Sequence, residues 1–217
     1  MLDARRHRKR LNAVKIYTAA PKMPYTHREG TMSTHIDYEI NKELGECYLF
    51  MGDFDKAETY YKKASDADPA QADAFLGLAT IAVQKGNLDL AREQYLKASE
   101  LKAYDKPLAG LGLIEMEQGR HEEAFDYFKQ ALGHNPGSMV AINGVVQEGY
   151  FLNRLEDVIP YLKAAIELDD AEPVRYTLAG CLTALGRDEE AKAELETLLG
   201  VNPDNQSARE LYARVAA

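Results

Sequence analysis

The sequence predicts an all-α fold, an α-solenoid of five helix-turn-helix repeats closed by one further helix. Three observations predict it: an apolar triplet recurs every 33 or 34 residues, a turn-forming residue recurs at the same interval, and three prolines lie 67 residues apart. A period of this length is typical of supersecondary units stacked into an array. The triplets begin at Ala57, Ala91, Ala124, Val158 and Ala191.

Each triplet marks the second helix of a repeat. Its members are spaced by four and three residues, which places them on one face of a helix. A small or β-branched side chain comes first, a ring or large aliphatic second, and a small or aliphatic one third. The triplets are Ala57-Tyr61-Ala64, Ala91-Tyr95-Ala98, Ala124-Phe128-Ala131, Val158-Leu162-Ala165 and Ala191-Leu195-Leu198.

A second apolar set precedes each triplet and marks the first helix of the repeat. Its spacing of three and four residues again predicts one helix face. Small members such as Gly45 and Gly112 are expected to let the two helices of a repeat approach closely, while the ring of each triplet fills the joint to the next repeat. The sets are Leu44-Gly45-Tyr48, Leu78-Ala79-Ala82, Leu111-Gly112, Val145-Val146 and Leu178-Ala179-Leu182.

One residue between the two helices predicts each turn. A helix commonly ends on a left-handed residue, which glycine supplies without strain and asparagine tolerates next best. The residues at this position are Gly52, Gly86, Gly119, Asn153 and Gly186. After the second helix, Pro69, Pro136 and Pro203 stop three of the repeats, because proline cannot continue an α-helix. Ala103 and Asp170 take that place in the other two, whose ends are less sharply marked.

These signals divide residues 38–204 into five repeats, and a last helix is expected to cap them. The repeats span about 38–71, 72–104, 105–138, 139–171 and 172–205. Within 205–217, an apolar stripe faces the last repeat and a polar face is expected to meet water. The stripe is Ala208, Leu211, Tyr212 and Val215, and the polar face is Gln206, Arg209, Glu210 and Arg214.

The repeats resemble the tetratricopeptide repeat family. The first repeat matches the family pattern at Leu44, Gly45, Tyr48, Gly52, Ala57, Tyr61, Ala64 and Pro69, and the third at Leu108, Leu111, Gly112, Gly119, Ala124, Phe128, Ala131 and Pro136. The fourth is weakest, because Val146 and Val158 replace small residues and Pro160 lies early in its second helix. The resemblance implies a right-handed superhelix that binds other proteins.

Residues 1–37 form a basic segment unlike the repeats. Residues 1–31 carry a net charge of +6, against −15 for the rest of the chain. Three alternatives stay open for it: a disordered arm, an arm that binds nucleic acid, acidic lipid or an acidic partner, or sequence upstream of the true start. Met32 is the candidate start, because Glu29-Gly30-Thr31 can be encoded by a purine-rich ribosome-binding sequence.

Charge and hydropathy exclude several classes of protein. Because nucleic-acid phosphates require cations, no nucleic-acid binding is expected along the acidic repeats, and a neutral to basic protein or peptide partner fits them better. No transmembrane segment is predicted, since no apolar run reaches about 18 residues. We therefore expect a cytoplasmic protein that reaches membranes only peripherally, through a partner. Cys47 and Cys181 occupy matching places four repeats apart, so burial is expected rather than a disulfide.

Motifs for catalysis, cofactors and metals are not found in the sequence. Gly110-Leu111-Gly112 lies inside a predicted helix rather than after a strand, so it does not predict a phosphate-binding loop. His121-Glu122-Glu123 lacks the second histidine of a helical zinc site and is expected to be a solvated helix start. The expectation is a non-enzymatic protein without catalytic, cofactor-binding or metal-binding residues.

The family resemblance implies a binding groove along the first helices. Asn143 and Gln147 are expected to hydrogen-bond a partner's backbone, and Met116, Tyr150 and Tyr176 to contact its side chains. The full set expected to line the groove is Leu76, Thr80, Leu113, Met116, Asn143, Gln147, Tyr150, Tyr176 and Thr183.

Two details refine this expectation. Gly77, Gly110 and Gly144 recur at one position, either to leave the groove floor open or to relieve crowding between helices. The carboxylate clamp of some family members is not expected, because Gly77, Gly110 and Glu46 stand where it requires amides and an arginine.

The leading hypothesis is an adaptor or scaffold that binds a peptide or helix of a partner and self-assembles. In size and repeat number the chain is similar to small scaffolds built only of such repeats, such as the one on the magnetosome membrane surface. One alternative is an accessory subunit of an enzyme, secretion or pilus system. Another is a regulatory protein whose basic N-terminal arm binds nucleic acid or acidic lipid.

Overall fold

The computed structural model describes residues 31–102 and 104–216, with side chains from residue 34 onward. All regular structure in these residues is helical, which confirms the predicted fold class. The chain divides into two compact units, residues 1–103 and 104–217. The basic N-terminal segment up to residue 30 lies outside the described residues.

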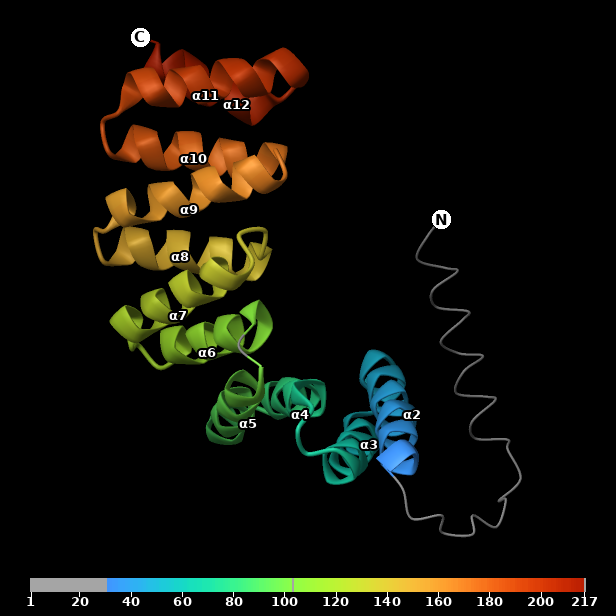
Figure 1. Cartoon of the computed structure of the whole chain (residues 1–217). Helices are drawn as coiled ribbons and strands as arrows, with labels where there is room; N and C mark the ends of the chain where they lie inside the picture. The colour runs from blue at the N-terminus through green and yellow to red at the C-terminus, as the bar shows by residue number, and fades with distance from the viewer. Residues whose placement is uncertain (1–30, 103, 217) are drawn as a thin grey trace. The chain divides into compact units, whose positions relative to one another are not determined.

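The first unit contains two helical pairs (Figure 1). The first helix begins seven residues before the expected first repeat. The helices are α2 (Thr31–Phe50), α3 (Phe54–Ala67), α4 (Ala72–Gln84) and α5 (Leu88–Leu101).

The second unit contains three helical pairs and the capping helix, stacked in chain order (Figure 1). Its pairs coincide with the third, fourth and fifth repeats expected from the sequence. The helices are α6 (Asp105–Glu117), α7 (His121–His134), α8 (Met139–Phe151), α9 (Leu155–Leu168), α10 (Glu172–Ala184), α11 (Asp188–Val201) and α12 (Gln206–Val215).

The turns inside the pairs adopt the left-handed backbone that the sequence predicts. The four turn glycines have φ between 71° and 77°, and Asn153, which replaces glycine in the fourth repeat, has φ 56°. The chain therefore reverses identically in every repeat. Its backbone hydrogen bonds also match: the N–H of Gly52 bonds the carbonyl of Leu49 at 3.0 Å, and that of Gly186 bonds the carbonyl of Thr183 at 3.0 Å.

The residue that precedes each second helix makes different contacts in the two units. In the first unit, the side chains of Asp53 and Asn87 accept bonds from backbone N–H groups three residues on, as N-caps usually do. In the second unit, arginines occupy this position: Arg120 pairs with Glu115 of its own repeat, whereas Arg154 and Arg187 pair with carboxylates of the preceding repeat. The Nη1 atom of Arg154 lies 2.8 Å from Glu122, and that of Arg187 lies 2.8 Å from Glu156.

Aromatic rings seated on glycines join neighbouring repeats. A β carbon added to Gly77 would collide with the ring of Tyr61, and one added to Gly144 would collide with the ring of Phe128. Gly112 of the preceding helix α6 would place its β carbon 2.6 Å from the same ring. These glycines therefore relieve crowding between helices, and the alternative of an open groove floor is wrong for Gly77 and Gly144.

We expect Gly144→Ala to lower the free energy of unfolding by about 1–3 kcal/mol, because the added methyl overpacks the joint with Phe128. The matched control is Gly133→Ala, an exposed glycine of α7 whose added β carbon meets no atom within 4 Å. That change should raise stability by about 0.5–1 kcal/mol through helix propensity. Urea unfolding followed by circular dichroism measures both, and equal effects would contradict the joint described here.

Candidate partner-binding site

The predicted groove residues divide between the two units. Leu76 and Thr80 lie on α4 of the first unit and are half-buried. The hydroxyl of Thr80 donates to the carbonyl of Leu76 at 2.9 Å. Its bonding to its own helix leaves it less available to a partner than the sequence suggested. The other seven residues lie on α6, α8 and α10 of the second unit.

One face of α8 presents a row of exposed polar and aromatic side chains. Asn143, Gln147 and Tyr150 are exposed, and their spacing of four and three residues puts them on the same helix face. Tyr150 is 50% exposed, although large aromatic side chains are usually more buried. This row can offer amide and phenol groups to a partner.

The two predicted residues of α6 differ in exposure. Leu113 is 43% exposed, whereas Met116 is half-buried and packs against the hydrophobic core of the second unit. Met116 is therefore better described as part of the core edge than as a free contact residue.

A cavity of about 380 Å³ lies between α8, α10 and α12. It brings together three of the predicted residues, Tyr150, Tyr176 and Thr183, whereas Asn143 and Gln147 lie outside its wall on α8. The volume falls within the usual range for ligand sites, roughly 300–1,000 Å³. The wall is formed by Val146, Tyr150, Tyr176, Thr177, Gly180, Cys181, Thr183, Ala184, Leu211 and Arg214.

The inner wall of this cavity is neutral. Burial raises the pKa of Tyr150, and neighbouring Cys181 raises it further, through the negative charge of its thiolate form and through a shared hydrogen bond. Burial likewise raises the pKa of the Cys181 thiol, although the bond from Tyr150 partly offsets this. Both groups therefore stay protonated at neutral pH.

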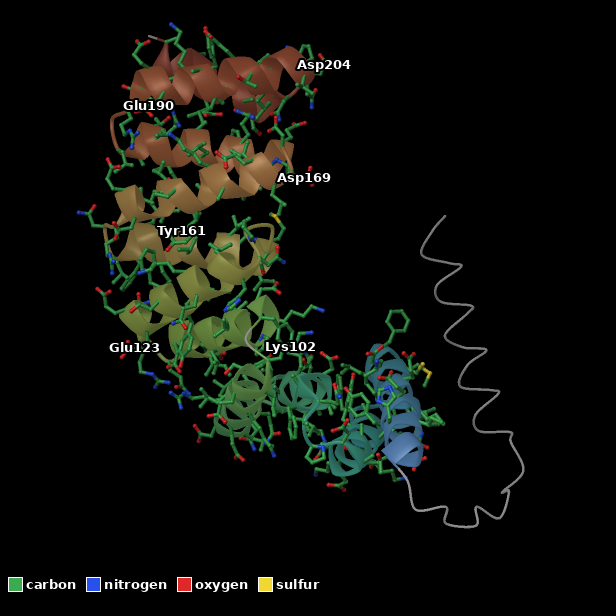
Figure 2. The ribbon with its side chains drawn as sticks, in the orientation of Figure 1. Lys102, Glu123, Tyr161, Asp169, Glu190 and Asp204 are labelled. Carbon is green, nitrogen blue, oxygen red and sulfur yellow. The ribbon has the colours of Figure 1, made fainter. Side chains whose placement is uncertain are left out.

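Figure 2 shows labelled carboxylates at the helix ends of this unit, with Glu190 on one edge and Asp169 on the other.

Sequence reasoning did not find the contribution of the capping helix. Leu211 and Arg214 of α12 line the cavity, although the sequence assigned Arg214 only to a water-facing surface. Leu211 is buried and Arg214 is exposed at the rim. Their spacing of three residues places both on one side of α12, a signal that the apolar stripe alone did not reveal.

The first unit holds a cavity of similar size, about 400 Å³, that includes none of the predicted residues. Ala82, with its small side chain, lines this cavity. The equivalent position holds the larger Tyr48 in the first repeat and Leu182 in the fifth. Its rim lysine, Lys85, already pairs with Glu58 at 2.7 Å. We regard it as the weaker candidate, because its rim charge is already satisfied.

Buried carboxylates in the second unit were also missed by sequence reasoning. Glu148 is 1% exposed, and its Oε2 atom lies 2.8 Å from Nδ1 of His121, whose ring stacks on Phe151 at 3.7 Å between centroids. Glu115 is equally buried and pairs with Arg120. The sequence predicted that His121 lies in a solvated helix start. This prediction was wrong for the His121 side chain, which joins α7 to α8 through Glu148 and Phe151.

His121→Ala should lower the free energy of unfolding by about 1–3 kcal/mol, because the buried Glu148 carboxylate would lose this partner. His134→Ala at the exposed end of the same helix is the control and should change stability by less than about 0.5 kcal/mol. Thermal or urea unfolding of the three chains measures this. A similar loss in both variants would show that the Glu148 pair has no special weight.

Cys181 should react slowly in the folded chain. Because burial raises the pKa of its thiol, the thiolate that attacks alkylating reagents is scarce at neutral pH, and burial also blocks access. Iodoacetamide labelling at about pH 8, read by mass spectrometry, should be at least about tenfold slower than in urea, and faster as pH rises. Equal rates in folded and unfolded chains would contradict the buried position.

Residues 31–102 and 104–216 hold no group of three histidine, cysteine, aspartate or glutamate side chains that could bind a metal ion. No helix in that part of the chain is long and apolar enough to cross a membrane. Cys47 and Cys181 are buried, and neither forms a disulfide within the described residues, as expected.

Comparison with protein families gives consistent matches along the chain. Two models described as tetratricopeptide repeat match residues 43–106 and 108–138, and residues 152–215. One curated relative is the BBSome complex member BBS4 of Bos taurus, 30% identical over 131 residues. The match covers 60% of this chain and 23% of that protein. Across six curated relatives, the chain spans 9% to 38% of their length.

Solved structures with the same fold include three small repeat proteins. Pseudomonas aeruginosa PilF aligns with a TM-score of 0.62 at 20% identity, over 84% of this chain and 92% of that one. YrrB, described as having an unusual peptide-binding site, aligns at 0.58 and 17% identity, over 84% and 97%. MamA aligns at 0.59 and 20% identity, over 76% and 91%. At these identities the likeness concerns the fold.

Proposed function

We propose that this chain, which belongs to the tetratricopeptide repeat family, is an adaptor or scaffold that binds a segment of a partner protein across α8, α10 and α12. The observation that carries the proposal is the cavity between these helices, with Tyr150 and Tyr176 in its wall. It takes up the groove expected from the sequence, but restricts it to the second unit.

The chemistry of this surface suits an extended peptide. The amides of Asn143 and Gln147 can each donate and accept hydrogen bonds, which is what a partner's backbone requires. Beside them, the rings of Tyr150 and Tyr176 provide large contact areas with few rotatable bonds. One apolar side chain of the partner would fill the cavity while its backbone runs along α8.

Relatives with the same fold support a binding role of this kind. YrrB is described as a peptide-binding repeat protein. A scaffold that self-assembles, as first expected from the sequence, is the finer form of the proposal. The likeness to PilF, named as a type IV pilus assembly protein, favours as second candidate an accessory subunit of a pilus or secretion system. Both uses require a partner on the repeats and no catalytic group.

The test is capture of partners from cells by the full chain, beside the variant Tyr150→Ala/Tyr176→Ala. We expect the main partner to be lost from the double variant, because both rings that line the cavity are removed. Tyr161→Ala is the control, since Tyr161 lies on α9 of the same unit and does not line the cavity (Figure 2). Circular dichroism establishes that all variants keep their helices.

Footprinting by cysteine alkylation tests whether a partner binds in the cavity. A partner bound in the cavity should slow alkylation of Cys181, which lines it, and leave Cys47 of the first unit unchanged. A partner retained equally by the double variant, with Cys181 unprotected, would move the binding site to another surface and reject the proposal.

A further inference from the structure

The wall of the second-unit cavity carries one cation and no carboxylate. Its ten lining residues include Arg214 but neither aspartate nor glutamate. This composition is unusual for a chain in which acidic residues outnumber basic ones by 35 to 26. The local charge of the cavity is therefore opposite to the charge of the chain as a whole.

Arg214 also differs from the other arginines of its unit. Within residues 104–216, every other arginine lies within 4.0 Å of a carboxylate, whereas no ion pair is found for Arg214. The pairs are Arg120 with Glu115, Arg154 with Glu122 and Asp157, Arg175 with Asp170 and Glu194, Arg187 with Glu156 and Glu190, and Arg209 with Asp204.

Contacts with α10 and α11 hold the capping helix, which carries Arg214, in place beside the cavity. The hydroxyl of Tyr212 donates to Glu196 of α11 at 2.9 Å, and Leu211 is buried against the core of the last repeat. At the start of α12, the side chain of Asn205 accepts from the N–H of Ala208 at 2.9 Å and also donates to Glu172 of α10. These contacts hold α12 against α10 and α11, and Arg214 of this helix lines the cavity.

We propose that the cavity takes an apolar side chain of a partner segment that carries an aspartate or glutamate close to it, and that this carboxylate pairs with Arg214. The inference rests on the proposed function and names the chemistry of its ligand. Guanidinium and carboxylate groups match in geometry and can form two parallel hydrogen bonds. The apolar part of the wall, including Val146 and Leu211, accounts for the apolar side chain.

The surface beside the cavity favours an internal segment of the partner over a chain terminus. Asn143 and Gln147 continue the binding face along α8 beyond the cavity wall, so a bound backbone can run on in that direction. The net charge of −9 disfavours a strongly acidic segment. The expected ligand is therefore a neutral or basic stretch of chain with a single carboxylate next to a large apolar residue.

The expected effect of the ion pair is moderate. Arg214 is exposed, and pairs between exposed charges are weakened by water and salt. We expect loss of the carboxylate to weaken binding about three- to tenfold, with a larger difference at low salt.

The first experiment is selection of binders from a library of random short peptides on the full chain and on three variants. The native chain should select peptides with a large apolar residue near an aspartate or glutamate. Arg214→Glu should select lysine or arginine in place of the acid. Arg209→Glu makes the same charge change on the same helix, at a residue that does not line the cavity, and should select the same peptides as the native chain.

The third variant, Tyr150→Ala/Tyr176→Ala, separates failure of the inference from failure of the proposed function. Peptides without a conserved acid that the double variant fails to bind would overturn the acidic ligand and leave the binding site standing. Peptides that the double variant binds as well, or no enrichment on the native chain, would overturn both.

A second measurement quantifies the pair. A selected peptide and its Glu→Gln or Asp→Asn derivative are titrated into the full chain by fluorescence anisotropy, at about 50 mM and about 500 mM salt. The derivative should bind the native chain about three- to tenfold more weakly at low salt, and should bind Arg214→Ala no more weakly than the parent peptide does. An equal loss of affinity in both chains would show that the peptide's carboxylate pairs with a cation other than Arg214.

Discussion

The seating of an aromatic ring on a glycine is the contact on which the repeat architecture depends. In each unit, a ring from the second helix of one repeat presses on a glycine in the first helix of the next, as Tyr61 does on Gly77 and Phe128 on Gly144. The ring supplies the buried area and the glycine supplies the space, so neither residue would achieve close packing without the other. Because a repeat buries its face mainly against its neighbours, these joints contribute directly to the stability of the array.

Charged side chains organise the edges of the second unit without replacing that core. Arg154 and Arg187 reach back to carboxylates of the preceding repeat, and the buried Glu148 is held by His121. Exposed pairs of this kind contribute little free energy each. A buried carboxylate is different, because losing its partner costs much more than the pair itself contributes. The arginines at these edges are thus paired within the unit, whereas Arg214 beside the cavity has no ion pair within residues 104–216.

The candidate site arises where the repeat pattern ends. The capping helix closes the last repeat with Leu211 and places Arg214 at the cavity rim. If a sixth repeat took the place of the capping helix, its first helix would lie here. The side chains of that helix would then line the cavity in place of Leu211 and Arg214. The cavity therefore combines residues that follow the repeat, Tyr150 and Tyr176, with a residue outside it. That combination gives the site a charge that the repeats alone would not provide.

The sequence by itself determined the helix pairs, their turns and the capping helix, because these depend on local spacing, on left-handed residues such as Gly119 and Asn153, and on apolar stripes. It also predicted that Tyr150, Tyr176 and Thr183 belong to one surface, since a repeat places equivalent residues alike. Only the tertiary structure decided that Gly144 lies under Phe128, that Glu148 is buried against His121, and that Arg214 reaches the cavity. Each of these depends on contacts between residues distant in the chain, whose side chains meet only after the helices have packed.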